Sequence, residues 1–260
     1  MTTGEAYAIA LDVGPDDYLE AVRAASPKKF KNYRRLEHRL EREVGPLRLI
    51  ADDRSEETLQ MLLQWKSDQF QRTGLQDVLR PAWVARLMQN LFAARGPHMS
   101  GLMMSLYAGD VLVAGHFGVR SESTYHPWIA SANPELSAYS PGQMFMGHAV
   151  RAMPELGLSV YDLGPGHDHY KRPYANVQRS PSAGLVTARS LGGAMAGAGE
   201  GAFGPAGLSR VAAVDKVRRR IDHIATLDPT PAGFIRGLGE AARGLSKRSL
   251  GNQPLSEGVG

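Results

Sequence analysis

Three neighbouring stretches of the sequence decide its fold: SGLMMSLYA (100–108), VLVAGHFGVR (111–120) and TYHPWIAS (124–131). Each is short and mostly apolar or aromatic, which is typical of buried β-strands. Gly109-Asp110 joins the first stretch to the second, and Ser121-Glu122-Ser123 joins the second to the third. Both connections are short enough for hairpins. The sequence therefore predicts three antiparallel strands in a row, a β-meander.

Helices are expected on both sides of this meander. Ser26-Pro27 is typical of a helix start, because proline suits the first helical position, and Gly45-Pro46 ends that helix. The elements outside the meander are predicted as strands at 7–11, 47–51, 158–163 and 183–189 and as helices at 16–25, 26–44, 55–73, 81–95, 141–153 and 167–175. This order predicts an α+β fold, in which helices cover the faces of a mixed sheet.

The composition excludes several classes of protein. The 260 residues are 43% hydrophobic and 22% charged, as in globular proteins. The chain has no Cys, which excludes disulfides, thiol nucleophiles and Cys-ligated metal centres. No apolar run approaches the roughly 20 residues of a membrane helix, and the polar start lacks a signal-peptide pattern. We therefore expect a cytoplasmic protein with no membrane partner.

Positive charge is concentrated in two segments. Residues 27–48 carry eight Lys or Arg against three Glu, and residues 210–248 carry nine against four acids, although the whole chain is only +4. Either segment could meet an anionic partner or be an ordinary solvated surface. Fourteen of the 29 Gly follow residue 189. This composition predicts a largely disordered tail at 191–260, with one helix near 208–227.

Common cofactor motifs give little support for other enzymes. A G-x-G-x-x-G pattern at Gly199, Gly201 and Gly204 follows no predicted strand, so a dinucleotide site is not supported. Neither a Walker A sequence nor a G-x-S-x-G elbow occurs. His167-Asp168-His169 lacks the ligand spacing of a common metal site, and no metal is expected.

Two breaks after predicted strands are more informative. Ser140-Pro141-Gly142 starts a helix, whose free backbone N–H groups could bind a pyrophosphate, although an ordinary capped helix has the same pattern. In the second break, Asp162 ends a strand shortly before Tyr170, Lys171 and Arg172. Together these side chains could supply a base, a proton donor and an anion clamp. A surface loop with a salt bridge remains an equal alternative.

A family resemblance covers about residues 20–190. The pieces HFGVR (116–120), YHPWIASANPELSAYSPG (125–142) and YDLGPGHDHYKRPYAN (161–176) resemble the GNAT-type acyltransferase domain of CelD-like cellulose-biosynthesis proteins, relatives of the FemAB peptidyltransferases. The resemblance implies a GNAT-like acyl-CoA N-acyltransferase fold, in which the meander splays from the 158–163 strand in a V. It also implies that 26–190 is the acyltransferase domain and that 1–25 is the remnant of a first lobe.

The resemblance assigns roles to residues of this chain. The expected catalytic residues are Asp162 as base or organiser, Tyr170 as proton donor, Lys171 as oxyanion or phosphate stabiliser, and His116 as an alternative base. The expected cofactor-binding residues are Ser140, Pro141, Gly142, Gln143, Gly164, Gly166 and Arg172. The expected substrate-binding residues are Arg34, Arg35, His126 and Trp128, and His126 is a further alternative for the base.

The function expected from these residues is acyl transfer from a thioester donor, such as acetyl-CoA, to an amine or hydroxyl in exopolysaccharide or cell-envelope biosynthesis. Direct attack is expected because the chain has no Cys to carry the acyl group. The alternatives are a non-catalytic accessory protein of polysaccharide synthesis and a FemAB-like transferase that uses aminoacyl-tRNA. The expected partners are a small-molecule or saccharide acceptor and an acyl carrier protein, with a homodimer as an open alternative.

Overall fold

The computed structural model describes residues 2–3, 5–165, 171–183 and 239. It divides into two compact units. The larger consists of residues 4–66 and 85–181, and the smaller of residues 1–3, 67–84 and 182–260. The predicted tail, its helix near 208–227 and most of the strand at 183–189 lie outside the described residues. Among the described residues no helix combines the length and the apolar character needed to cross a membrane.

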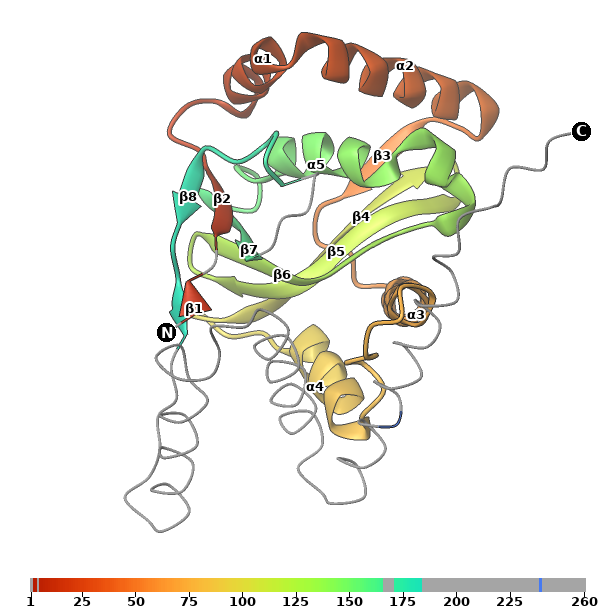
Figure 1. Ribbon diagram of the computed structural model, residues 1–260, viewed down its shortest axis with the longest axis vertical. Coiled ribbons are helices and arrows are strands. Elements are labelled where there is room, and N and C mark those ends of the chain that lie inside the picture. Colours follow the sequence, from red (N-terminus) through yellow and green to blue (C-terminus); the bar gives the residue numbers. More distant parts are fainter. Residues whose placement is uncertain (1, 4, 166–170, 184–238, 240–260) are drawn as a thin grey trace, which may run out of the picture. The chain divides into compact units, whose positions relative to one another are not determined.

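The larger unit is built on a seven-stranded mixed sheet with the order β3-β4-β5-β6-β7-β2-β8 (Figure 1). Its strands are β2 (Ala6–Ala10), β3 (Leu47–Ile50), β4 (Ser100–Ala108), β5 (Val111–Ser121), β6 (Thr124–Ala132), β7 (Val160–Pro165) and β8 (Val177–Arg179). Every neighbouring pair is antiparallel except β6 and β7, which run parallel. The predicted meander is confirmed as β4-β5-β6, and the mixed α/β architecture is the fold that the sequence predicts.

Helices cover both faces of this sheet (Figure 1). On one face α1 (Pro15–Ala25), α2 (Pro27–Glu43) and α5 (Pro141–Ala152) enclose the main core. The other face is covered by the parts of α3 (Glu56–Arg72) and α4 (Ala82–Ala93) that belong to this unit. The core residues with the largest buried side chains on the first face include Tyr125, Tyr161, Phe145, Ile9, Leu19 and Leu40.

The N-terminal strand is an internal part of this sheet. β2 pairs with β7 along Ala6–Ala10 and with β8 along Ala6–Ala8. Tyr18 and Leu19 of α1 are buried in the same core. The unit therefore does not begin at the predicted boundary near residue 26, because β2 supplies the hydrogen-bonding partner of both β7 and β8.

Three local features differ from what the sequence pattern predicts. A helix was expected at 167–175, but residues 171–174 form a turn that leads into β8, and Pro173 has no N–H with which to continue a helix. A short 3₁₀ helix at Pro134–Tyr139, which the sequence pattern did not predict, follows β6 and precedes α5. Serine was expected to cap two helices. Ser26 and Ser140 do occupy the positions before α2 and α5, but neither side chain makes a capping hydrogen bond.

β6 and β7 separate after a short contact, and this gives the sheet the V-shaped opening that the resemblance implied. Their ladder contains only Thr124 with Val160 and Tyr125 with Tyr161. The β5–β6 ladder shifts register between Phe117 and Gly118, which leaves Trp128 as the extra residue of a β-bulge. Such a bulge bends its strand, so β6 turns away from β7 at this point. We refer to the space between the diverging strands as the splay.

Gly118 is required for this bulge, and its substitution tests the geometry. A Cβ at Gly118 would lie 2.2 Å from the carbonyl oxygen of His126 and 2.6 Å from Cα of Pro127, both backbone atoms of β6. We expect Gly118→Ala to lower the free energy of unfolding by more than about 2 kcal/mol. Gly142→Ala is the matched control, because nothing lies within 4 Å of its Cβ position. Urea unfolding measures both, and equal stabilities would contradict the assigned role.

Candidate active site

The face of the splay that α5 covers contains a buried histidine. His116 of β5 lies beside Phe145 of α5, with ring centroids 4.3 Å apart, and its Nδ1 is 2.6 Å from the hydroxyl of Tyr161 on β7. Burial is the main cause that lowers the pKa of His116 to about 3, and the nearby cations Lys66 and Lys171 contribute to the same shift. The imidazole is therefore neutral at neutral pH. Because a base must hold the proton that it accepts, this environment disfavours the predicted role of His116 as base.

The opposite face of the splay contains a second histidine in a more open position. His126 of β6 and Asp162 of β7 have side chains that are 38% and 32% exposed. Nδ1 of His126 lies 3.1 Å from the carbonyl oxygen of Asp162 and 3.5 Å from its carboxylate. A carbonyl oxygen can only accept a hydrogen bond, so neutral His126 carries its proton on Nδ1. The lone pair on Nε2 is then the basic position.

An irregularity inside β7 orients Asp162, because the β2–β7 ladder shifts register there and leaves Leu163 unpaired in the ladder. The backbone N–H of Gly164 donates to Oδ1 of Asp162 over 2.9 Å. Gly164 has φ +70°, a left-handed conformation that glycine adopts without strain. A Cβ there would lie 3.1 Å from Cε1 of His126, so a larger residue would crowd the ring. The sequence D-L-G at 162–164 thus places a carboxylate and a close-packed imidazole together.

Two lysines lie at the splay. Lys171, which is 6% exposed, donates from Nζ to the carbonyl of Pro165 at the end of β7 over 3.0 Å. Lys66 of α3 donates to the carbonyl of Ala130 on β6 over 3.3 Å. The direction of the Ala130 carbonyl follows from a neighbouring bond. The N–H of Asn133, which directly follows β6, donates to the carbonyl of Val113 on β5, so the backbone groups of the odd-numbered residues of this stretch face β5. Because backbone groups alternate in direction along an antiparallel ladder, the Ala130 carbonyl points away from β5, toward the splay.

Sequence reasoning did not select Lys66. The only sequence feature that marked Lys66 was its position on the same side of a predicted helix as the apolar residues Leu59 and Leu62. Leu62 is fully buried against the sheet, and its carbonyl accepts a hydrogen bond from Ser131 of β6. The neighbouring turn of α3 therefore brings Lys66 to the same strand.

The predicted phosphate-binding residues lie at the start of α5. Ser140 has φ 57°, Pro141 occupies the first helical positions, and Gly142 is open to its surroundings. The Gln143 carbonyl accepts from the Tyr174 hydroxyl over 2.9 Å. Because the Ser140 side chain makes no capping bond, it does not compete with a ligand for the N–H groups of this first turn.

The remaining predicted residues are not all gathered here. Trp128 is 44% exposed at the bulge, and Arg172 is exposed. Arg34 lines a separate groove between helices, whereas Arg35 is exposed and bonds to Asn32 on its own helix. Gly166 and Tyr170 lie outside the described residues, so the structure tests neither. The structure thus brings together His116, His126, Asp162, Gly164, Lys66 and Lys171.

Comparison with known proteins identifies the family of this domain. A family model described as an acetyltransferase (GNAT) domain matches residues 27–172, which is more than half of the chain. The chain therefore belongs to the GNAT acetyltransferase domain family. It is also similar to a solved structure described as a conserved protein of unknown function from Bacteroides thetaiotaomicron, at 14% identity and a TM-score of 0.44, covering 70% of this chain and 62% of that one. No curated protein matches the chain.

The low pKa of His116 predicts an acid-sensitive fold. The unfolded chain binds a proton near pH 6.5, and the folded chain does so only near the His116 pKa of about 3. The contribution of His116 is therefore complete above about pH 6.5 and falls by about 1.4 kcal/mol per pH unit below it. We expect His116→Gln to flatten the dependence of unfolding free energy on pH between about 6 and 4, measured by urea titration. The exposed control His98→Gln should leave the slope intact, and an unchanged slope in His116→Gln would contradict this assignment.

Proposed function

We propose that this chain transfers an acyl group, with acetyl the first expectation, from acyl-CoA to an amine or hydroxyl. The family membership supports acyl transfer in general. The single observation that carries the proposal is the splay, where two parallel strands separate next to two histidines, an aspartate and two lysines. A narrow thioester arm can lie between the strands, because the described parts of β6 and β7 share no ladder pair beyond Tyr125 and Tyr161.

In this proposal the edge of β6 stabilises the reacting carbonyl. Backbone groups of β6 that face β7 beyond Tyr125 are not used in the β6–β7 ladder, so their N–H groups are available to the developing oxyanion. The ammonium of Lys66 on the Ala130 carbonyl adds positive potential at the same edge. Lys171 supplies a second cation at the end of β7. We assign Lys171 to the thiolate that leaves when the C–S bond breaks.

The acceptor side of the proposal rests on His126. An amine or hydroxyl attacks the thioester carbon directly, and Nε2 of His126 takes the proton as the new C–N or C–O bond forms. The Asp162 carboxylate, 3.5 Å from Nδ1, stabilises the imidazolium that results. The leaving thiolate takes a proton from solvent and the imidazolium of His126 returns its proton to solvent, so that one thiol and one acylated acceptor are released. A covalent acyl-enzyme is not required, and the chain contains no Cys to form one through a thiol.

The biological acceptor follows from the sequence resemblance alone. We propose an amino or hydroxyl group of a saccharide in exopolysaccharide or cell-envelope biosynthesis. The competing tRNA-dependent transfer would use the cations of α2, which include Lys28, Lys29, Arg34 and Arg35. It predicts binding to RNA that weakens steeply with salt. A stable protein partner without any response to donor would favour the accessory alternative.

Donor binding is the first test, because it needs no acceptor. Acetyl-CoA at 100 times its dissociation constant should stabilise the fold by about 2.7 kcal/mol, measured as a saturable rise in the unfolding temperature. Pantetheine is the companion ligand, since it has the arm but no phosphate. A cooperatively folded sample that responds to neither acetyl-CoA nor pantetheine would contradict an arm-specific donor site.

The role of His126 is tested by substitution. His126→Asn keeps a donor toward Asp162 but removes the base, and we expect kcat to fall about 100- to 10,000-fold. The acetyl-CoA concentration that gives half of the maximal rise in unfolding temperature should stay within about twofold of the wild-type value, because binding of the donor arm does not require the base. His38→Asn, an exposed histidine on α2, is the matched control. Unchanged turnover in His126→Asn would remove His126 from the mechanism.

A further inference from the structure

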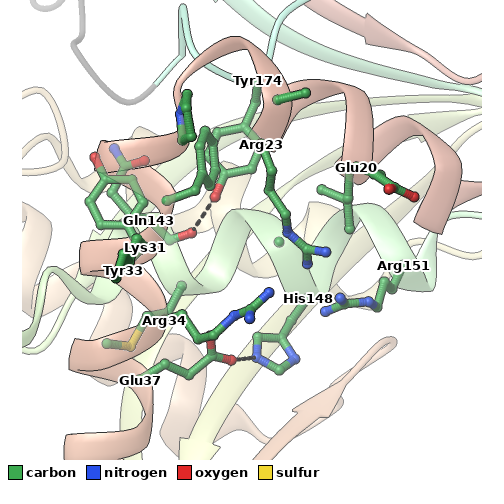
Figure 2. Close-up of a pocket in the computed structure, with 16 residues that line it drawn as sticks. Glu20, Arg23, Lys31, Tyr33, Arg34, Glu37, Gln143, His148, Arg151 and Tyr174 are labelled. Atoms are coloured by element: carbon green, nitrogen blue, oxygen red, sulfur yellow. Dashed lines mark hydrogen bonds and ion pairs between the residues drawn. The ribbon is translucent and has the colours of Figure 1, made fainter.

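A groove of about 410 Å³ lies between α1, α2 and α5, on the outer side of α5 (Figure 2). All of its lining residues belong to the larger unit. Four cations line it: Arg23 from α1, Lys31 and Arg34 from α2, and Arg151 from α5. The acids among its lining residues are Glu20 and Glu37. The groove therefore carries an excess of positive charge.

Neither of the two acids that line the groove forms an ion pair with one of its arginines in the described part of the chain. Glu37 accepts from Nε2 of His148 over 2.9 Å, and this hydrogen bond, with smaller contributions from Arg151 and His38, lowers the pKa of Glu37. Arg151 pairs through Nε with Asp16 over 3.0 Å. Within the part of the chain that the structure describes, neither Arg23 nor Arg34 has an ion-pair partner.

Three helices aim guanidinium groups at one space. Figure 2 shows the ends of Arg23, Arg34 and Arg151 directed toward the same region beside His148. Arg23 and Arg34 have no ion-pair partner among the described residues, and Arg151 pairs with Asp16, which does not line the groove. Like charges that converge repel one another, and an anion between them offsets that repulsion. Planar guanidinium groups bind phosphate oxygens in pairs of parallel hydrogen bonds. A phosphate is therefore the anion that best matches this space.

The rest of the groove suits a larger molecule attached to that phosphate. Phe30, Tyr33 and Tyr174 form an aromatic part of the wall, and their edge-to-face contacts hold the rings together. The side-chain oxygen of Gln143 is buried and has no hydrogen-bond partner among the described residues. It offers an acceptor to a hydroxyl or amino group of the bound compound.

We propose that this groove is a binding site for a phosphate or pyrophosphate group of an organic ligand, held by Arg23, Arg34 and Arg151. The site lies outside the splay, and its existence does not depend on acyl transfer. Two sources share the required chemistry. One is the nucleotide end of the CoA donor, because the first turn of α5 contains the predicted phosphate-binding residues 141–143, and Gln143 also lines the groove. The other is a separate phosphorylated compound.

Inorganic pyrophosphate is the probe for the site itself. Calorimetric titration of the full chain should show saturable binding, which Arg23→Gln and Arg34→Gln each weaken about tenfold or more. Neither substitution strands an acid that was paired. Arg35→Gln is the matched control, because Arg35 neighbours Arg34 on α2, is exposed, and bonds only to Asn32 among the described residues. It should change the affinity less than about twofold.

A second measurement separates a site from general charge attraction. In phosphate-free buffer, Arg23→Gln combined with Arg34→Gln should unfold at the same or a higher temperature than the wild type, because like-charge repulsion is removed. Pyrophosphate should raise the unfolding temperature of the wild type and not of this double variant. The absence of saturable binding to the folded wild type, or an equal loss in Arg35→Gln, would overturn the proposal.

CoA and 3′-dephospho-CoA distinguish the two sources. If the donor supplies the phosphate, saturating CoA should block pyrophosphate binding. If the group in the site is the 3′-phosphate, wild type should also prefer CoA about tenfold, and Arg34→Gln should abolish that preference. If a separate compound supplies it, both donors should bind equally, and pyrophosphate should still bind when CoA is saturating. Pyrophosphate binding without any CoA binding would reject the acyl-transfer proposal and leave the groove site standing. CoA binding without pyrophosphate binding would reject the groove site and leave the acyl-transfer proposal standing.

Discussion

The hydrogen bond between His116 and Tyr161 is the interaction on which the candidate site depends. β6 stands between β5 and β7, yet it separates from β7 after a ladder of only two residue pairs. Backbone hydrogen bonds therefore cannot hold these strands together beyond Tyr125. The contact from His116 on β5 to Tyr161 on β7 passes over β6 and ties the strands at the base of the splay. Desolvation of both groups makes that bond strong and makes its loss costly.

The two faces of the same strands have different tasks because side chains alternate along a strand. Tyr125 and Tyr161 point into the core under α5, where their ring centroids lie 5.0 Å apart. Their immediate neighbours, His126 and Asp162, point to the opposite face and stay partly exposed. The dry face thus fixes the geometry of the splay, and the wetter face carries groups that can exchange protons. A one-residue shift in either strand would exchange these tasks.

The N-terminal segment connects the sheet to the surface of the unit. β2 fills the sheet between β7 and β8, and α1 follows it onto the face that α5 occupies. α2 then packs through Leu36 and Leu40 and leaves its cations outward. The positive charge of this segment is therefore divided. Part of it faces solvent, and part lines the groove together with Arg151, where an anion would offset the repulsion between like charges.

Local pattern was sufficient for the meander and the α-helices up to residue 153, because hairpins and amphipathic helices depend on residues close together along the chain. The GNAT-type fold followed from the family resemblance. Local pattern failed at 171–174, which form a turn that contains Pro173. Only the tertiary structure decided that His116 is buried and neutral, that His126 meets Asp162, and that Arg34 and Arg35 diverge. These outcomes depend on contacts between residues far apart in sequence. Such contacts form when the whole core packs, and hydrophobic periodicity does not specify which polar groups then meet.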